Sequence, residues 1–559
     1  MWSEWNPSVE CSALEERTLK LCKKQKLWSF LRRYRHVLLD DEVRADLGSM
    51  YARGSRRAGE PIAPERLALA MLLQVAFDVP DHEVPTLTAV DRRWQMVLDC
   101  MGAEEPILSQ GTVFNFRERA RENGFMERLL QKTVVLARES GGFSAKRLRA
   151  LIDSSPLVGA GRVEDSFNLL GRAIAKLVDV AASEAGQKPE ELATELELSV
   201  AAGSSVKAAL DVDWRLPSAR NDALRELISQ FERLSVWLQA QFSEEQLSTP
   251  PLHDALAVVG RIMEQDTVPE PEPPSPGRSG PAEHDSVTAA KPESTSVESG
   301  TGPSVSSRKL RDGTVPERLI SLADPDMRHG CKSKTKKFNG YKRHIVGDAD
   351  IAGLIHDVQV LPANQREHDA AEPLLKRVQA RGFELTELHI DRGYLAAEMV
   401  HELRRENVIV ISKPPTPARS ERYGKYDFHL DEKAKLLTCP AGISIPYQGD
   451  GKSHRFPSAD CRACSRRAQC VSPKNDYGRA IKTHAHETFF REMHADLGTP
   501  QGRARRRARI PVEHTLARVG QIQGRSARFR GLEKNQFDLT RTAVVANLYV
   551  LGRVLPEAA

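Results

Sequence analysis

The sequence predicts an α/β core built on a mixed sheet, preceded by an all-helical segment at residues 1–140. Strand-like alternation and helical apolar spacing follow one another through residues 309–415, as in crossover units. A separate strand pattern at residues 148–153 stands upstream, ahead of a long stretch with helical spacing at residues 164–265. A chain of 559 residues exceeds one compact core, so we expect two to four domains.

Composition narrows the protein class. The chain is 40% hydrophobic and 28% charged, and it has no run of about 18 apolar residues, so we expect no membrane span. The N-terminus lacks a basic segment followed by an apolar one, which predicts no secretory signal and a cytoplasmic protein.

The N-terminal segment carries two clear helix signals. Pro64 opens an apolar helix that reaches Phe77, and Ser109 is placed to cap a helix that continues to Asn123. The second helix carries Arg117, Arg119 and Arg121. A short helix, a turn and a basic helix favour a DNA reader of the helix-turn-helix kind. The alternative is an amphipathic core helix with a solvated arginine face.

Strand order brings two acids together. The predicted strands are residues 148–153, 338–346, 351–361, 384–391 and 407–412, with helices at 367–379 and 395–405. If the first three strands form an antiparallel meander, the last two can add parallel to the first, which then lies beside the fourth. Asp153 and Asp391 would face each other across these strand ends, which is a ribonuclease-H-like arrangement. Read alone, Asp391 could equally cap the helix that follows it.

Positive charge is clustered, although the net charge is only +5. Residues 332–342 and 503–509 are rich in lysine and arginine, and a third cluster surrounds Phe529. Several clusters on one segment favour a polyanionic partner, whereas a single cluster would indicate a solvated basic helix. Glu513 lies four residues after Arg509, so the alternative for this acid is an ion pair on a surface helix.

Four of the eight cysteines are grouped. Cys439, Cys461, Cys464 and Cys470 have the spacing C-x21-C-x2-C-x5-C, which favours a tetrahedral zinc site of structural type. The alternative is four unligated thiols, and His484 and His486 are other candidate ligands. A cytoplasmic disulfide is disfavoured.

Several motifs together resemble the DDE transposases of bacterial insertion sequences, in the group with a cysteine-bearing insertion. The matching stretches are the four residues Asp153, Ser154, Ser155 and Pro156, DPDMRHGCKSKTKKFNGYKRHI from Asp324, HIDRGY from His389, the cysteine set, RIPVEHTLARV from Arg509 and NLYVL from Asn547. Each motif is weakly specific, but their order and spread are strongly specific. The chain departs from the pattern at two positions: Arg506 stands where many relatives have Tyr, and Gly520 where Lys is common.

The resemblance implies a catalytic and metal-binding triad of Asp153, Asp391 and Glu513 that holds two Mg²⁺ or Mn²⁺ ions. It implies cleavage at insertion-sequence ends and strand transfer to target DNA, with double-stranded DNA (terminal inverted repeats and target) and a second copy of the chain as partners, at the nucleoid. Expected phosphate contacts are Lys334, Lys336, Lys337, Lys342, Arg509, Arg525, Arg528, Arg530 and Lys534. Two alternatives remain: a transposase-derived DNA-binding protein without catalysis, and a DNA nuclease without strand transfer.

The expected domain organisation follows from these assignments. It comprises an N-terminal helical DNA-binding domain (1–140), the first catalytic strand (144–163), a helical insertion (164–265), a disordered linker (266–308), the rest of the catalytic core (309–415), a cysteine-rich insertion (416–498) and a C-terminal catalytic helix with a basic region (499–559). The linker is rich in Pro, Ser, Gly and Glu and cannot bury enough apolar area to offset ordering.

Overall fold

A computed structural model describes residues 5–51, 62–143, 146–203, 205–270, 308–333, 335–415, 421–472 and 477–555. The chain forms two compact units. The larger unit comprises Met1–Val158, Lys342–Leu361 and Gln365–Ala559, and the smaller unit comprises Gly159–Tyr341 and Pro362–Asn364. Among the described helices, none combines the length and the apolar character that a membrane crossing requires.

The described residues at the start of the larger unit form eight helices. They are α1 (Ala13–Leu21), α2 (Lys26–Leu38), α3 (Asp41–Ser49), α4 (Pro64–Phe77), α5 (Val84–Val90), α6 (Arg92–Leu98), α7 (Gln110–Glu122) and α8 (Phe125–Ser140). Helix α4 starts at Pro64, and the Ser109 hydroxyl caps α7 by accepting a hydrogen bond from the backbone N–H of Thr112 at 3.1 Å. Both predicted helix starts are therefore confirmed.

The arginines of α7 are not a solvated face. Arg117 is buried, and its guanidinium donates two hydrogen bonds to Asp81, at 2.6 and 2.7 Å. Arg119 lies over the ring of Tyr51, and Arg121 donates to Glu118. The helix packs into the core through Val113, Phe116 and Ala120, as the core-helix alternative predicts, but Arg117 does not lie on a solvated face because Asp81 pairs with it.

The sheet is mixed, as predicted. Its strands are β1 (Arg147–Val158), β4 (Arg328–Cys331), β5 (Lys337–Asp348), β6 (Ile355–Pro362), β7 (Glu384–Ile390) and β8 (Ile409–Ile411). The order is β4-β5-β1-β7-β8, with β6 also paired to β5. Strand β7 runs parallel to both β1 and β8, which confirms that the first and fourth predicted strands are neighbours.

Three local expectations needed correction. β1 continues five residues past Asp153 to Val158, so this acid does not end its strand. The segment after Asp391 is a 3-10 turn, η2 (Arg392–Ala396), and the α-helix α17 (Glu398–Arg405) starts only after it. Strand β4 was not predicted; it pairs antiparallel with Lys337–Gly340 of β5.

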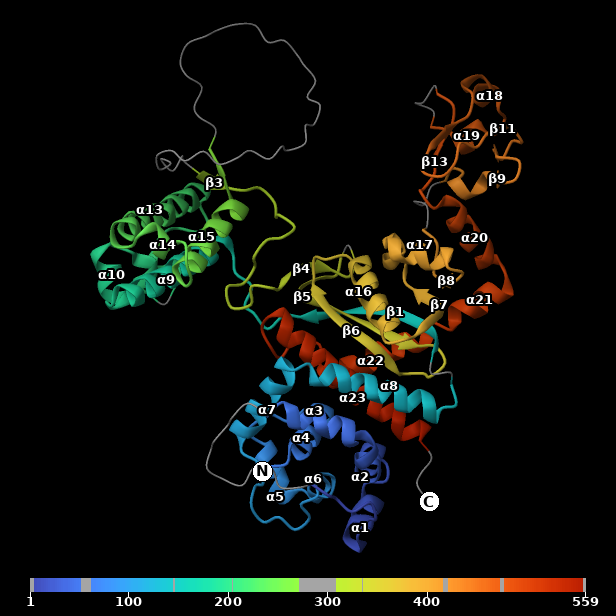
Figure 1. The fold of residues 1–559 in the computed structure, drawn as a ribbon. Helices are drawn as coiled ribbons and strands as arrows, with labels where there is room; N and C mark the ends of the chain where they lie inside the picture. Colours follow the sequence, from blue (N-terminus) through green and yellow to red (C-terminus); the bar gives the residue numbers. More distant parts are fainter. Residues whose placement is uncertain are drawn as a thin grey trace, which may run out of the picture. The chain divides into compact units, whose positions relative to one another are not determined.

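Helices flank the sheet of the larger unit. Between β6 and β7 lie η1 (Glu367–Ala370) and α16 (Ala371–Ala380), and the C-terminal segment contributes α21 (Pro500–Arg507), α22 (Ile510–Gln523) and α23 (Leu532–Val554). Figure 1 shows α8, α22 and α23 together on one side of the sheet, where α22 also contacts β1. The Asn547 side chain of α23 exchanges two hydrogen bonds of 2.8 Å with the backbone of Ile355, which fixes α23 to the start of β6.

The smaller unit is mainly helical, as the apolar spacing of residues 164–265 predicts. Its helices are α9 (Ser166–Ala185), α10 (Pro189–Glu195), α11 (Ser199–Ala202), α12 (Val206–Ala209), α13 (Pro217–Gln241), α14 (Glu244–Leu247) and α15 (Leu252–Asp266). Strand β2 (Thr267–Pro269) then pairs with β3 (Arg308–Leu310), so the ends of the expected linker are ordered in this structure. The expectation for residues 271–307 lies outside the described residues.

The cysteine-bearing segment has a small apolar cluster beside its cysteines. Its elements are η3 (Lys425–Asp427), β9 (His429–Asp431), β10 (Leu436–Thr438), β11 (Ser444–Pro446), β12 (Ser453–Arg455), α18 (Ser458–Ala463), α19 (Arg467–Cys470), β13 (Ala480–Lys482) and α20 (Glu487–Gly498). Among the described residues, one cluster of buried apolar side chains consists of Phe428, Leu437, Phe456 and Ile481, and Cys439, Cys461 and Cys470 pack against it. Val471 and three side chains of α20, namely Phe489, Phe490 and Met493, are also buried.

Candidate active site

Parallel pairing of β1 and β7 brings two acids together. Ile152 and Ile390 are register partners, so the next residues, Asp153 and Asp391, follow the same pair of positions on neighbouring strands. The Asp153 side chain is 14% exposed and that of Asp391 is 47% exposed. The predicted juxtaposition of these two carboxylates is present, and one of them is accessible from solvent.

A single arginine bridges the two carboxylates. Arg509, at the start of α22, places Nη2 2.9 Å from Asp153 Oδ2 and Nη1 3.4 Å from Asp391 Oδ1. Burial raises the pKa of Asp153, the charge of Arg509 opposes that rise, and the charges of Asp391 and Glu367 add to it. The sequence assigned Arg509 to DNA phosphate, whereas in this structure its guanidinium bridges the two carboxylates.

Glu513 lies one turn further along α22. It lines a cleft of about 300 Å³ together with Arg509 and Ile390, the residue that precedes Asp391. The other cationic lining residues are Lys413, Arg503, Arg506 and Arg507. Within the described residues no ion pair joins Arg509 to Glu513, because the guanidinium turns to the aspartates. The surface ion-pair alternative for Glu513 is therefore wrong.

The donor chemistry of the acid pair suits a hard divalent cation. Carboxylate oxygens are the ligands that Mg²⁺ and Mn²⁺ prefer, and a cationic guanidinium already lies between the two carboxylates here. Among the residues that the structure describes, however, no group of three or more His, Cys, Asp or Glu side chains is arranged to hold a metal ion. Asp153 and Asp391 are thus brought together, and Glu513 is not brought into a ligand set with them.

Sequence reasoning missed a further acid beside this pair. The Ser154 hydroxyl donates a 2.7 Å hydrogen bond to Glu367 Oε1. A methyl group added at Gly393 would come within 1.9 Å of Glu367 Oε2. Glu367 thus contacts both the residue after Asp153 and the second residue after Asp391. The only sequence signal was Gly393, since a glycine in a turn can mark a close approach of another group.

A buried tyrosine anchors the same turn. Tyr394 is fully buried, and its hydroxyl lies 2.7 Å from Nδ1 of His344 on β5. Burial lowers the pKa of His344 to about 3, so the imidazole is neutral at physiological pH and can accept the hydroxyl hydrogen. The turn that follows Asp391 is therefore held by β5 as well as by Glu367.

The predicted phosphate contacts divide into two groups. Lys342 donates to the backbone oxygen of Gln365 at 2.6 Å, and Arg509 binds the aspartates, so both are engaged within the protein. The others are exposed: Lys336, Lys337, Arg525, Arg528, Arg530 and Lys534. Arg528 also pairs with Asp78 at 2.7 Å. Lys334 lies outside the described residues.

The four grouped cysteines line one small cavity of about 20 Å³. Burial raises the pKa of Cys470, and the charges of the other three cysteines act on it with Arg479 opposing them. His484 and His486 do not line this cavity. His486 instead stacks on His401 with ring centres 3.4 Å apart, and His484 packs on Phe490. The four cysteines therefore share a cavity, but among the described residues they are not arranged as a metal-holding group either.

Comparison with known proteins agrees with this geometry. Residues 314–548 match the family model described as "Transposase DDE domain". No curated protein and no solved structure matches the chain. The matched range includes Asp391, Arg509, Glu513 and Glu367, while Asp153 lies upstream of it. This match assigns residues 314–548 to the transposase DDE domain family.

Proposed function

We propose that this protein is a transposase that cuts DNA strands at the ends of an insertion sequence and joins them to target DNA. The observation that carries the proposal is the acid pair: Asp153 and Asp391 lie side by side on parallel strands, bridged by Arg509, in a chain with a transposase DDE domain. Cutting a phosphodiester requires stabilisation of the negative charge that develops at the phosphate. Carboxylates that bind cations, with an arginine beside them, can supply this stabilisation.

Three acids would hold two Mg²⁺ or Mn²⁺ ions, namely Asp153, Asp391 and Glu513. Such ions activate the attacking oxygen and stabilise the leaving oxygen. In the proposed reaction, water attacks a backbone phosphorus, the P–O3′ bond breaks, and the 3′ oxygen leaves as a hydroxyl. That hydroxyl then attacks a phosphorus of the target DNA, forming a new P–O3′ bond and releasing a target 3′ hydroxyl. Arg509, which bridges the two aspartates, would turn to DNA phosphate when they bind cations.

DNA is the proposed partner, in the form of terminal inverted repeats and target. The exposed basic residues named above would neutralise phosphates, so DNA affinity should fall steeply with salt. The N-terminal helices would contribute to recognition of the repeats, and two copies of the chain would hold two ends. The protein would act in the bacterial cytoplasm, on nucleoid DNA.

We further propose a structural zinc ion on Cys439, Cys461, Cys464 and Cys470. All four line one cavity, and the apolar cluster beside them has only four buried side chains among the described residues. A closed thiolate site would stabilise such a segment without taking part in chemistry.

The test is incubation of the protein with DNA carrying the element ends, Mg²⁺ or Mn²⁺ and a plasmid target. Joined products support transposition, nicks without joining support a nuclease, and a bound, uncut complex supports a binding-only protein. Asp153→Ala, Asp391→Ala and Glu513→Ala should each abolish cleavage and keep DNA binding. The control is Glu372→Ala on α16, an exposed acid paired with Lys376. Cleavage retained in Asp391→Ala would contradict the assignment.

A further inference from the structure

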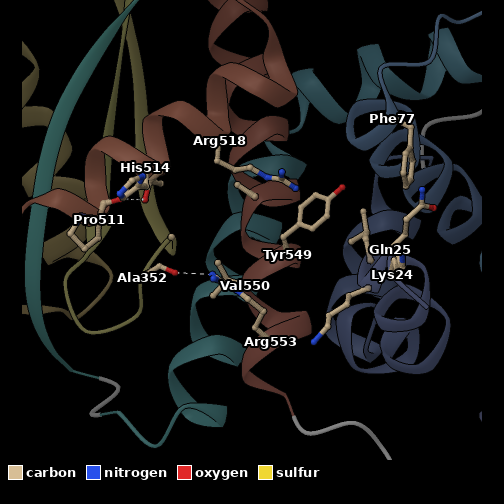
Figure 2. Close-up of a pocket in the computed structure, with 15 residues that line it drawn as sticks. Lys24, Gln25, Phe77, Ala352, Pro511, His514, Arg518, Tyr549, Val550 and Arg553 are labelled. Carbon is tan, nitrogen blue, oxygen red and sulfur yellow. Dashed lines mark hydrogen bonds between the residues drawn. The ribbon is translucent and has the colours of Figure 1, made fainter. Parts of the chain in front are cut away.

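A second pocket of the larger unit lies on the same helix as Glu513. It has a volume of about 710 Å³ and is bounded by the start of α2, the turn at Ala352–Gly353, α22 and α23. On α22 it is lined by His514 and Arg518, whereas Glu513 lines the cleft described above. Figure 2 shows Lys24 and Gln25 on one side of this space and Arg518 and Tyr549 on the other. We call this space the α22–α23 pocket.

Among the described residues, four cations and no acid line the α22–α23 pocket. Lys24, Lys26, Arg518 and Arg553 line it, together with His514, and no Asp or Glu does. Within the described residues none of these four cations pairs with a carboxylate, in contrast to Arg117, which pairs with Asp81. Uncompensated like charges around one pocket raise its positive potential and attract an anion.

The two arginines are already oriented by neutral groups. Arg518 lies over the ring of Tyr549, 4.1 Å from its centre, and Arg553 donates to the backbone oxygen of Ala352 at 2.9 Å. A guanidinium that lies over a ring keeps N–H groups at its edge, and such edges bind phosphate oxygens in pairs. The entropic cost of ordering these side chains on a ligand is thereby reduced.

The positive surface extends beyond one pocket. Lys26 also lines a neighbouring pocket of about 310 Å³, to which α1, the turn after it and α2 contribute Lys20, Lys23 and Arg33. Of these, Arg33 pairs with Glu16. The stretch KLCKKQK from Lys20 to Lys26 supplies most of this charge. Cations repeated along a surface suit a ligand with repeated phosphates better than a single small anion.

We propose that the α22–α23 pocket binds backbone phosphates of double-stranded DNA, with the surface from Lys26 to Lys20 continuing the contact. The inference rests on the proposed function, because it takes DNA as the partner, and it adds a binding surface that the catalytic acids do not form. Since His514 and Arg518 share α22 with Glu513, DNA held there would also fix the helix that carries this acid.

The test is the salt dependence of DNA binding by the full-length protein. Log Kobs falls as log salt rises, and the triple variant Lys24→Gln, Lys26→Gln, Arg518→Gln should make this fall shallower. The magnitude of the slope should decrease by about 0.9 for each phosphate that the variant no longer neutralises, which is about 2.7 for three phosphates. The matched control removes three exposed cations of the smaller unit: Lys188→Gln, Arg215→Gln, Arg225→Gln. Arg518→Lys, which keeps the charge, should keep the slope.

Three outcomes are decisive. The proposal is supported if the salt dependence becomes shallower in the triple variant and not in the control, with circular dichroism verifying that the triple variant is folded. If wild type binds and cleaves DNA but the triple variant keeps its slope, or matches the control, this inference is overturned and the proposed function stands. If wild type neither binds nor cleaves DNA, the proposed function itself fails. Loss of binding to polyglutamate without loss of DNA binding would identify an acidic protein as the occupant and also overturn the proposal.

Discussion

Replacing Glu367 by alanine tests whether an acid outside the predicted triad positions it. The Glu367 carboxylate accepts a 2.7 Å hydrogen bond from Ser154 and lies against Gly393. It therefore links the strand that carries Asp153 to the turn that follows Asp391. The alanine variant removes this link without touching either aspartate, so we expect slower cleavage with little change in DNA affinity.

The size of the effect follows from the hydrogen bond that the variant removes. A hydrogen bond to a charged group contributes about 1.5–3 kcal/mol, and the half-buried position of Glu367 favours the lower part of that range, about 1.5–2 kcal/mol. If this energy serves to hold the acids in register, each 1.36 kcal/mol costs about tenfold in rate. The cleavage step should then slow by about 10- to 30-fold.

The assay is single-turnover cleavage of element-end DNA at saturating protein, with DNA binding measured in parallel. Glu372→Ala is the control, because it removes the same charge from the exposed face of α16. Gly393→Ala should act through the same contact, since its methyl group would displace the Glu367 carboxylate. The double variant should therefore be less than additive with the two single variants.

Two results would refute the positioning role. Glu367→Ala could cleave at the wild-type rate, or Glu367→Ala and Glu372→Ala could slow cleavage equally. A fall in DNA affinity that accounts for the whole loss of rate would instead make Glu367 a binding residue.

Three other predictions concern stability and metal content. Arg138→Met should destabilise the larger unit by about 3–5 kcal/mol in urea unfolding, because it leaves Asp348 buried without its arginine partner, both side chains being at most 2% exposed. Cys464→Ser should lose zinc, measured by mass spectrometry of the purified protein, and should unfold the cysteine-bearing segment at lower temperature. Arg117→Ala should lower stability and leave the salt slope of DNA binding unchanged. The hydrogen bonds from Arg117 lower the pKa of Asp81, so this stabilisation is complete above the ordinary carboxyl pKa and is lost as the pH falls through the lowered one.

The sequence could predict the features that depend on apolar periodicity and on the order of strands and helices. Strands separated by helices imply parallel neighbours, and together with an antiparallel meander of the first three strands this rule places Asp153 beside Asp391. The end of β1 could not be predicted, because Pro156 and the serines before it resemble a turn although the chain stays extended to Val158. The apolar periodicity of the sequence shows where the strands that carry Asp153 and Asp391 lie, and the order of the strands predicts that these two acids are neighbours.

Partners of charged side chains could not be predicted in the same way. Arg117 was expected at a solvated or DNA-facing surface, and it binds Asp81 inside the protein. Arg509 was expected on phosphate, and it bridges two carboxylates. A long side chain pairs with whichever opposite charge the tertiary fold brings within reach, and no local pattern encodes that distance.

The points at which the helical insertion enters and leaves the sheet explain why it does not change the register of β1 with β7. The smaller unit starts at Gly159, directly after β1, and its main segment ends at Tyr341 inside β5, the strand next to β1. Its two ends meet, since the backbone N–H of Gly159 donates to the oxygen of Asn339 at 2.8 Å. Because the ends of the insertion are already adjacent, its length adds only a slowly growing closure cost, and the register of β1 with β7 does not depend on it. Shortening the insertion between α9 and β3 while keeping Gly159 and Asn339 should therefore preserve cleavage, and loss of cleavage in a folded, shortened chain would show that the insertion contributes to the reaction.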